Sequence, residues 1–329
     1  MTSGSRGTAV RMGVLALLWG SGFLWIKLAL NHGLSPLQIT VARCVLGAAV
    51  LLAIALASGA RLPRDRRTWG HLVVAAFLCN ALPFFLFGLG EQTVDSSVAG
   101  VLNATTPLWS LLIGIGLGTE RGPRPIRLGG LVLGFAGTLL IFAPWQRSGL
   151  FGWGALALLG AAVSYAAAFA YMGRTLTGRG TEPLALSAAQ LVTASGLSIL
   201  ALPAGGLAPV RADATALVAV VVLGIFGTGF TFFLNYRLIA DEGATSAATV
   251  GYLLPVVSVA LGAVVLGEAI GPRVVLGMLT VLAGVAMTRG RGRATQEPGA
   301  GSVSVSVTSV SATPSVTAAV SEAVSDCRR

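Results

Sequence analysis

The stretch VAGVLNATTPLWSLLIGIGLGTE, residues 98–120, has a proline in the middle of a long apolar segment and a glutamate at its end. The stretch ATVGYLLPVVSVALGAVVLGE, which ends at Glu268, has the same layout. Pro107 corresponds to Pro255 and Glu120 to Glu268, at a constant offset of 148 residues. Two copies of one unusual segment indicate that the chain contains an internal duplication.

The duplication extends over three further regions, at offsets of 147 or 148 residues. The matching groups are Ser35-Pro36 with Glu182-Pro183, Phe84-Phe85-Leu86 with Phe232-Phe233-Leu234, and Gly130 and Gly137 with Gly277 and Gly284. The first of these alignments places Gln190 where the first copy has Arg43. Agreement over four regions indicates that most of the chain is duplicated.

The composition indicates a protein embedded in a membrane rather than two soluble domains. Apolar residues make up 54% of the 329 residues, charged residues only 10%, and the mean hydropathy is +0.82. A soluble protein carries about 25% charged residues, and a helix that crosses a bilayer needs about 20 mostly apolar residues. Because such stretches recur from residue 10 to residue 289, the sequence predicts an all-α membrane protein.

Ten apolar stretches are predicted as membrane spans. They cover residues 10–31, 37–58, 69–90, 95–117, 127–144, 151–173, 184–203, 214–237, 244–266 and 271–289. The two copies, residues 10–144 and 145–289, then hold five spans each. Since five is odd, the second copy lies inverted in the membrane, and inverted repeats are typical of transporters. We therefore expect ten transmembrane helices as two inverted five-helix repeats around a central cavity.

Basic residues are distributed unevenly over the predicted loops. With an inner N-terminus, fifteen fall on the inner side: Arg6, Arg11, Arg61, Arg64, Arg66, Arg67, Arg121, Arg124, Arg127, Arg174, Arg179, Arg237, Arg289, Arg291 and Arg293. Only Arg147, Arg211 and Arg273 fall on the outer side. Because cytoplasmic loops retain Lys and Arg, we expect both termini in the cytoplasm and a multi-pass protein of a bacterial-type plasma membrane. The same bias explains the net charge of +10 without nucleic acid as a partner.

Two terminal segments fall outside the predicted spans. Residues 1–9 are polar and predict a short cytoplasmic tail. Residues 290–329 are rich in Ser, Val, Thr and Ala, with too few large apolar side chains to form a core, and predict a disordered cytoplasmic tail. The three cysteines, Cys44, Cys79 and Cys327, do not have the spacing of metal ligands, and we expect neither a metal nor a cofactor.

The segment LLWGSGFLWIKLAL at residues 17–30, the arginine inside the second span and the paired proline–glutamate helices resemble the EamA group of the drug/metabolite transporter superfamily. The glycines spaced by seven residues after each glutamate match this group as well. The resemblance covers residues 10–289 and implies ten helices in two halves around a central cavity, in proteins that export or exchange small metabolites. It implies no particular substrate. Gln190 departs from the pattern because it replaces the arginine, so we expect an asymmetric cavity.

Lys27 and Arg43 are the only basic residues inside predicted spans and away from their ends. At about 1.5 Å per residue, Lys27 lies about 6 Å and Arg43 about 10 Å below the outer ends of their spans. A cation at that depth is costly unless it faces a cavity or has partners. Lys27 can alternatively extend to the interface, and Arg43 can bond helix ends. Since no Asp or Glu falls at mid-bilayer, we expect no buried acid, and we favour a substrate with an anionic group.

Neutral polar and aromatic residues in the spans are further candidates for the cavity. Asn103 and Asn80 rank highest, because a carboxamide that faces lipid is costly. The other candidates are Asn235, Thr106, Trp19, Tyr165, Tyr252 and Gln190, with Thr105 and Trp109 as weaker ones. The Thr105 hydroxyl can bond a carbonyl group of its own helix instead.

The two proline helices carry structural or gating candidates. A proline inside a helix frees a backbone carbonyl and can kink the span. We therefore expect Pro107 and Pro255 to bend their helices at mid-membrane and to open backbone polar groups towards the cavity. Glu120 and Glu268 end their helices, where a carboxylate is unfavourable. We expect each to form an ion pair with a nearby arginine that fixes a loop, with a gating role as the alternative.

These features favour a transporter over an enzyme. A serine protease in the membrane needs a histidine at depth, whereas His32 is predicted in a loop and His71 at the start of a span. The predicted function is export or exchange of small metabolites, amino-acid-like or otherwise carboxylate-bearing, by alternating access, with facilitated exchange preferred. The alternatives are a proton-coupled antiporter of drugs or metabolites and a receptor or scaffold that transports nothing. The expected partners are the substrate and the lipid bilayer, and a homodimer is compatible with the sequence.

Overall fold

The structure is a computed structural model that describes residues 3–94, 96–118, 125–143, 152–204, 206–207, 209–210, 213–257 and 271–288. Residues 1–292 form one compact unit, and all of the described residues belong to it. The elements are α1 (Ser3–Gly20), α2 (Gly22–Asn31), α3 (Pro36–Ala57), α4 (Arg66–Ala76), the π-helix η1 (Phe77–Ala81), α5 (Leu82–Gly90), α6 (Ser96–Asn103), α7 (Thr106–Gly116), α8 (Pro125–Phe142), α9 (Trp153–Thr175), α10 (Pro183–Leu200), the short 3₁₀ helix η3 (Leu202–Ala204), α11 (Ala214–Gly224), the π-helix η4 (Ile225–Phe230), α12 (Thr231–Glu242), α13 (Ala244–Ala248), the 3₁₀ helix η5 (Thr249–Tyr252) and α15 (Pro272–Thr288).

The described part of the chain contains helices and no strands, which confirms the all-α fold class. Seven helical segments are long and apolar enough to cross a membrane: 7–31, 36–57, 66–90, 99–116, 153–175, 183–200 and 214–242. Three shorter apolar helices, 125–141, 244–257 and 272–288, lie where the fifth, ninth and tenth spans are expected. The helix α1 starts at Ser3, and the candidate membrane span that contains it starts at Gly7.

Local sequence explains where several helices begin. Ser35 accepts from the backbone N–H of Gln38, whose side chain in turn accepts from the backbone N–H of Ser35, and Pro36 occupies the first helical position of α3. This reciprocal arrangement satisfies two amide groups that the helix cannot pair internally. Asp65 and Asp213 cap α4 and α11 with their carboxylates. These two caps stand 148 residues apart, the offset of the sequence duplication.

Two spans contain a π-helical segment at equivalent positions. The segment η1 interrupts the span from α4 to α5, and η4 interrupts the span from α11 to α12. Phe77 and Ile225, the first residues of these segments, are again 148 residues apart. Single π-helical turns inside α-helices are frequent at functional sites, and both segments contain residues that form the polar contacts described below.

The spans that contain Pro107 and Pro255 are interrupted just before each proline. The helix α6 ends at Asn103, and α7 begins at Thr106 with Pro107 in its first turn. In the second copy the 3₁₀ helix η5 precedes Pro255, which lies in the helical residues 253–257. The interruption has a physical cause, because proline cannot donate the hydrogen bond that would continue the preceding turn.

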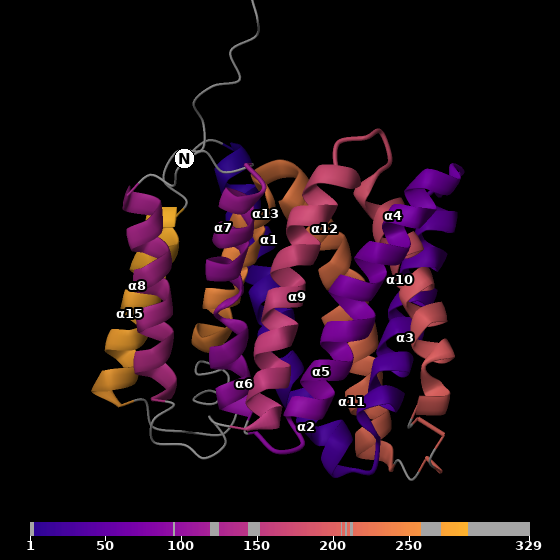
Figure 1. Ribbon diagram of the computed structural model, residues 1–329, viewed down its shortest axis with the longest axis horizontal. Helices are drawn as coiled ribbons and strands as arrows, with labels where there is room; N and C mark the ends of the chain where they lie inside the picture. The colour runs from indigo at the N-terminus through magenta and orange to yellow at the C-terminus, as the bar shows by residue number, and fades with distance from the viewer. Residues whose placement is uncertain are drawn as a thin grey trace, which may run out of the picture. The chain divides into compact units, whose positions relative to one another are not determined.

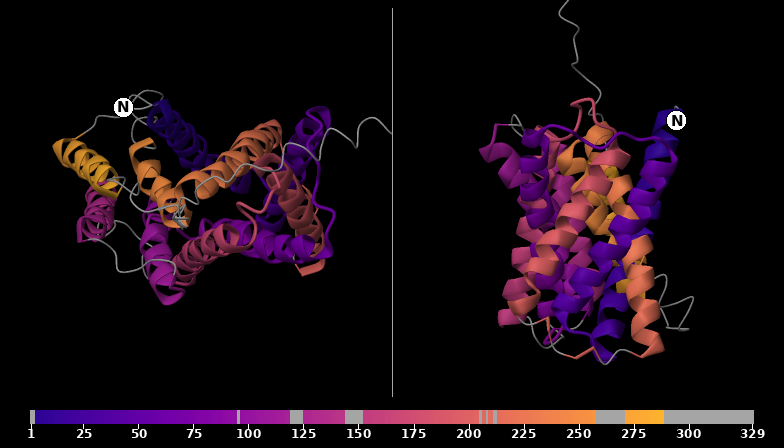
Figure 2. Two further views of the ribbon diagram at one scale, coloured as in Figure 1. Left: turned by 90° about the horizontal axis from the view of Figure 1, so that it is seen from above. Right: turned by 90° about the vertical axis from the view of Figure 1, so that its right-hand side faces the viewer.

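The helices α8 and α15 pack directly against each other, as Figure 1 and Figure 2 show. Glycines make this contact possible. A Cβ atom added at Gly130 would lie 2.7 Å from the carbonyl oxygen of Gly284, and one at Gly137 would lie 2.8 Å from that of Gly277. The four glycines that repeat in the sequence therefore form one close interface, as small residues do between membrane helices.

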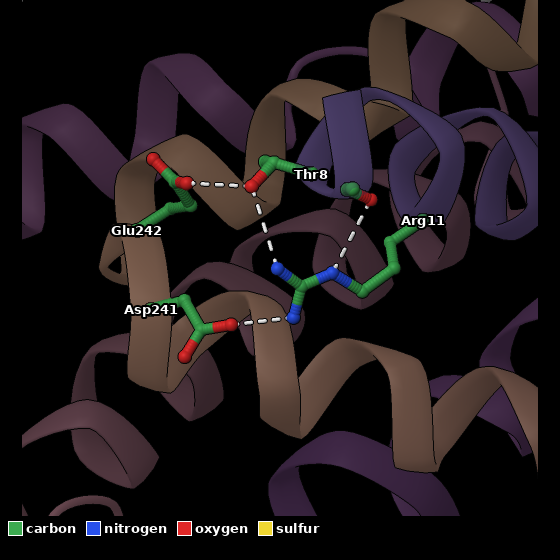
Figure 3. Close-up of polar contacts among 5 residues, drawn as sticks. Thr8, Arg11, Asp241 and Glu242 are labelled. Carbon is green, nitrogen blue, oxygen red and sulfur yellow. Dashed lines mark hydrogen bonds and ion pairs between the residues drawn. The ribbon is translucent and has the colours of Figure 1, made fainter. Parts of the chain in front are cut away.

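Polar contacts at both ends of the first span join it to the span that contains η4. At one end, Arg11 forms an ion pair with Asp241, and the Thr8 hydroxyl donates to Glu242 across 2.9 Å (Figure 3). At the other end, His32 Nδ1 lies 2.7 Å from an oxygen of Asp213. We call the end where α1 begins and α12 ends the α1 face, and the end where α2 terminates the α2 face.

Some expectations concern residues outside the described ranges. Glu120 and Glu268 are among these residues, and so is the predicted tail 290–329. The ion pairs, the gating alternative and the character of the tail therefore stay predictions.

Candidate functional site

One cavity lies between the helices and takes residues from both copies. Its empty space is about 600 Å³, including its open side. The lining residues are Trp19, Gly22, Phe23, Ile26, Arg43, Phe87, Asn103, Thr106, Tyr165, Phe169, Gly227, Ala248, Gly251 and Leu254. Five residues expected from the sequence are among them: Trp19, Arg43, Asn103, Thr106 and Tyr165. Ile26 and Phe87 lie within two turns of the ends of α2 and α5, so the cavity extends towards the α2 face.

Arg43 is the only cation among the described residues that line this cavity. Its side chain is 6% exposed, its Nε donates to Oγ1 of Thr228 across 3.0 Å, and its guanidinium carbon lies 3.5 Å from the centre of the Phe84 ring. The aromatic face and the hydroxyl hold the planar group in one orientation. A guanidinium can bind a carboxylate through two parallel hydrogen bonds, so this arrangement can receive an anionic group from the cavity.

The π-helical segment η4 explains why Thr228 is available to Arg43. The Thr228 hydroxyl donates to the carbonyl oxygen of Leu223 across 2.9 Å, five residues earlier in the chain. Because that hydroxyl donates its only proton to the carbonyl, its oxygen is left to accept from Arg43. The local helix geometry therefore fixes the acceptor on which the orientation of Arg43 depends.

The interruption before Pro107 places polar backbone beside the cavity. Pro107 cannot donate to the carbonyl oxygen of Asn103, and the Thr106 hydroxyl takes this role across 2.7 Å. Gly251, at the interruption of the second copy, lies opposite: a Cβ atom added there would be 3.9 Å from the carbonyl oxygen of Asn103. The two interrupted spans thus contact each other and together form one wall of the cavity. The Thr105 hydroxyl, between the two helices, donates to the carbonyl oxygen of Leu102 in α6 across 2.6 Å.

Aromatic rings form much of the remaining wall. The ring centres of Trp19 and Phe169 lie 6.4 Å apart with nearly parallel planes, and those of Tyr165 and Phe169 lie 6.0 Å apart. Phe87 contacts both Phe23 and Tyr165, at 5.7 and 6.0 Å. This continuous set of rings offers an apolar surface next to the Arg43 guanidinium. The cavity can therefore accept a molecule with one anionic end and one apolar part.

Known proteins resemble this chain over most of its length. The sequence profile of the EamA-like transporter family matches residues 9–143 and, a second time, residues 152–290. The chain belongs to the EamA-like transporter family. It is therefore a multi-pass membrane protein and a membrane transporter.

Individual relatives of this EamA-like transporter have similar descriptions. An uncharacterized transporter of Bacillus subtilis, YvbV, is 24% identical over 290 residues, covering 87% of this chain and 93% of that protein. An uncharacterized inner membrane transporter of Escherichia coli, YedA, is 27% identical over 257 residues, covering 77% and 81%. A solved crystal structure superposes with a TM-score of 0.69 at 21% identity, covering 86% of this chain and 96% of the other, which supports the fold alone.

Lys27 lies outside the cavity lining. Its Nζ donates to the backbone carbonyl oxygen of Glu91 across 2.7 Å, and the side chain is half-buried. The amine therefore bonds the end of α5, which is a structural contact between the first and third spans. A role of Lys27 in binding stays a prediction.

The expectation that no acidic side chain is buried is wrong, because Glu91 is 0% exposed. It follows the last residue of α5, and the sequence therefore suggested a solvated span end. The structure places it inside the protein, where its backbone binds Lys27 and its carboxyl group interacts electrostatically with Arg43. The EamA-like transporter thus has a carboxylate near the two cations, and the proton-coupled alternative regains support.

Gln190 and Asn80, both expected in the cavity, instead form a buried polar network. Gln190 Nε2 donates to Asn80 Oδ1 across 2.6 Å, and the Tyr236 hydroxyl donates to Gln190 Oε1. All three side chains are 0% exposed. Here Gln190 takes the place that Arg43 has in the first copy, and Asn80 takes that of Thr228.

Asn235 and Tyr252 are also buried away from the cavity. Neither nitrogen nor oxygen of the Asn235 carboxamide has a hydrogen-bond partner among the described residues, and the same holds for the Tyr252 hydroxyl. Tyr252 packs against Gly134, where an added Cβ atom would meet its ring at 2.9 Å. Helix periodicity alone does not separate a side chain that faces a cavity from one that faces another helix.

Several cavity or supporting residues were missed by the sequence reasoning. These are Phe23, Phe87, Phe169, Thr228 and Glu91. Thr228 could have been found, because it stands 148 residues after Asn80, which was a leading candidate. The phenylalanines carry no comparable signal, since an aromatic residue in an apolar span packs equally well against lipid, helix or cavity.

Proposed function

We propose that this EamA-like transporter moves small carboxylate-bearing metabolites, amino-acid-like compounds among them, by alternating access through the cavity that Arg43 lines. The observation that carries the proposal is the oriented guanidinium beside an apolar wall. In a dry site the carboxylate of a substrate gains a charge-assisted, bidentate hydrogen bond. The aromatic rings bind the apolar part, so that molecules with both features are selected.

The balance of charge supports an anionic substrate. Near the cavity, the described residues include two cations, Arg43 and Lys27, and one buried carboxylate, Glu91. One excess positive charge is costly at membrane depth unless a partner neutralises it. A bound carboxylate would supply that partner.

Four repeated features support the division into two inverted five-helix halves, residues 10–144 and 145–289. The π-helical segments, the Asp caps and the polar bonds of Arg43 and Gln190 each occur twice at offsets of 147 or 148 residues. The family profile also matches twice. We infer ten spans, with the three shorter apolar helices as the fifth, ninth and tenth.

Counterflow into proteoliposomes tests the proposal. Vesicles loaded with an unlabelled compound should accumulate the labelled one, and a panel of carboxylates should be compared with their uncharged amides. We expect exchange of some carboxylates and of none of their amides. Arg43→Gln should reduce carboxylate exchange about tenfold or more, since a hydrogen bond to a charged group contributes about 1.5–3 kcal/mol.

Arg237→Gln is the matched control for Arg43→Gln. Arg237 also lies over a phenylalanine ring, that of Phe233, but it is exposed and outside the cavity. The same loss of charge there should leave exchange within about twofold of wild type, as expected of an exposed site. Equal exchange by wild type and Arg43→Gln would contradict the proposal. A chain that transports nothing in the panel would instead behave as the receptor or scaffold alternative.

A proton-coupled antiporter is the second candidate, and the burial of Glu91 is the observation that favours it. A buried carboxyl near two cations can change its protonation when the substrate binds. Export should then be driven by a pH gradient, and Glu91→Gln should abolish this dependence but retain exchange. Facilitated exchange, which we prefer because the described residues that line the cavity include no Asp or Glu, predicts equal exchange with and without the gradient.

We also propose that both termini are cytoplasmic in a plasma membrane. The arginine bias supports this orientation, and the description of YedA as an inner membrane transporter agrees with the location. Protease protection of terminal tags in oriented vesicles tests the orientation. The homodimer stays a prediction.

A further inference from the structure

The cavity contains both members of three repeat pairs, of which Gly22 and Phe169 are one, at the offset of 147. At the offset of 148, Asn103 pairs with Gly251 and Thr106 with Leu254, and all four residues line the cavity. Residues at matching positions of the two copies can line the same cavity only where the two copies lie next to each other. The wall formed by the two interrupted spans therefore lies between the proposed halves.

Other lining residues have repeat partners that are fully buried. Arg43, Phe87 and Gly227 line the cavity, whereas their partners at offsets of 147 or 148 do not. Those partners are Gln190, Asn235 and Cys79, each 0% exposed. One member of each of these pairs therefore lines the cavity, and the other is buried between packed helices.

The members of one of these pairs, Phe87 and Asn235, lie towards opposite faces. Phe87 is three residues from the end of α5, and Lys27 joins that end to the region where α2 terminates, at the α2 face. Asn235 is seven residues from Glu242, the last residue of α12, which ends at the α1 face. The cavity extends towards the α2 face, and the buried partner of Phe87 is closer to the α1 face.

The burial of Asn235 is costly in this conformation. Its carboxamide is fully buried, and neither its nitrogen nor its oxygen has a partner among the described residues. The nitrogen of Asn80, in the neighbouring polar network, also has none. An unpaired buried amide costs about 1–3 kcal/mol. An apolar residue such as Phe87, its repeat partner, would avoid this cost, so the carboxamide is better explained by exposure in a second conformation.

We propose that Asn235, Gln190 and Cys79 line a second form of the cavity, which opens towards the α1 face when the two halves exchange conformations. The inference rests on the alternating access proposed above. In an inverted repeat each half can adopt the conformation of the other, which moves the opening to the opposite face. The same exchange would turn the residues that are now buried into lining residues and supply water or substrate to the Asn235 amide.

The second form differs from the first in its chemistry. The substrate carboxylate meets the Arg43 guanidinium on the α2 side, but the neutral carboxamides of Gln190 and Asn235 on the α1 side. Hydrogen bonds between neutral and charged groups are weaker than those between two ions. The form open to the α1 face should therefore bind the anion less tightly, with a higher KM for substrate supplied from that face.

Accessibility of single cysteines to a membrane-impermeant, sulfonate-bearing methanethiosulfonate tests the proposal in sealed vesicles of both orientations. The background is the full chain with Cys44→Ala, Cys79→Ala and Cys327→Ser. Phe87→Cys should react from one face, which identifies the α2 face. Asn235→Cys should react from the opposite face. Leu238→Cys is the control, because Leu238 is 1% exposed on the same helix and its repeat partner, Gly90, does not line the cavity. It should react about tenfold more slowly than Asn235→Cys.

The native cysteines provide a second measurement without a foreign residue at the reporting position. Cys79 and Cys44 are both 0% exposed, but only Cys79 has a lining residue, Gly227, as its repeat partner. With Cys327→Ser and one of the two replaced by alanine, Cys79 should react from the α1 face and Cys44 from neither. This comparison stands even if Asn235→Cys fails to fold.

The outcomes separate this inference from the proposed function. Reaction of Phe87→Cys, together with no reaction of Asn235→Cys or Cys79 from either face, overturns the second cavity and leaves the Arg43 site intact. Equal rates for Cys79 and Cys44 overturn it as well, because they would reflect general loosening of the fold. Loss of counterflow in Arg43→Gln with opposite-face labelling of Asn235→Cys supports both.

Discussion

Gln190 donates from Nε2 to Oδ1 of Asn80 across 2.6 Å, and Arg43, its counterpart in the first copy, donates from Nε to Oγ1 of Thr228 across 3.0 Å. Asn80 and Thr228 are themselves 148 residues apart, and both lie in π-helical segments. The same contact therefore occurs twice, once with a cation and once with a neutral amide. Only the charged version reaches the cavity.

Replacing Gln190 with methionine should destabilise the protein. The change keeps the approximate shape of the side chain but leaves the Asn80 carbonyl and the Tyr236 hydroxyl buried without their present partner. Each of these two groups costs about 1–3 kcal/mol, so we expect a loss of about 2–6 kcal/mol and a lower melting temperature in detergent.

The control for Gln190→Met removes the whole polar network. Combining it with Asn80→Leu and Tyr236→Phe leaves no unpaired group, and the melting temperature should recover much of the loss, since exchanging both partners for apolar groups is nearly neutral. A triple variant no more stable than the single one would show that the network is not the source of the effect.

Thr228→Val should weaken substrate binding and retain Arg43. The valine has a similar shape but cannot accept from Arg43 Nε, so the guanidinium loses its fixed orientation. A bond to a charged group contributes about 1.5–3 kcal/mol, and we expect KM in the exchange assay to rise about tenfold. The maximal rate should change much less.

Thr231→Val is matched to Thr228→Val. The Thr231 hydroxyl is equally buried, but it bonds only the carbonyl oxygens of Gly227 and Thr228. Its loss should affect stability slightly and KM hardly at all. Equal KM values for the two variants would show that Thr228 does not position Arg43.

The sequence was sufficient for the features that depend on local chemistry. The all-helical membrane fold follows from hydropathy and is confirmed by the described helices. The interruptions before Pro107 and Pro255 follow from the missing amide proton of proline. Because a buried cation is costly without a partner, the sequence predicted that Arg43 requires a hydrogen-bond acceptor. Thr228 is that acceptor.

Features that depend on which helix face meets which neighbour could not be predicted. Hydropathy places Lys27 and Tyr252 inside spans but does not tell whether they face lipid, helix or cavity. Lys27 bonds a backbone carbonyl and Tyr252 packs against Gly134. Glu91 looked solvated because it ends a span, yet tertiary packing buries it completely. These outcomes depend on helix rotation, which only the packed structure determines.

The helix caps of Asp65 and Asp213 should make stability sensitive to acid. Hydrogen bonds from the side chain and backbone of Thr68 lower the pKa of the Asp65 carboxyl, and those from the Ala216 backbone and His32 lower that of Asp213. A carboxyl with a lowered pKa stabilises the fold above its unfolded pKa, about 3.9 for Asp. This contribution is lost as the pH falls through the lower folded pKa.

Asp65→Ala isolates one of these caps. Its melting temperature should be below that of wild type at neutral pH, and the difference should shrink as the pH falls below about 4. Asp65→Asn keeps a capping side chain and should lose less at neutral pH. A difference between Asp65→Ala and wild type that stays constant through the acid range would contradict the role of the charged cap.

Alanine at two adjacent glycines of α8 should change stability differently, because only one of the two glycines lies against the backbone of α15. A Cβ atom at Gly130 would lie 2.7 Å from the carbonyl oxygen of Gly284, whereas one at Gly129 would meet only the end of Met287, at 3.5 Å. Gly130→Ala must separate two backbones, at a cost of about 1–3 kcal/mol. Gly129→Ala should instead be neutral or stabilising by up to about 1 kcal/mol, because alanine favours the helix. Thermal unfolding of both variants in detergent measures the difference, and equal melting temperatures would show that the close approach of the two helices does not contribute to stability.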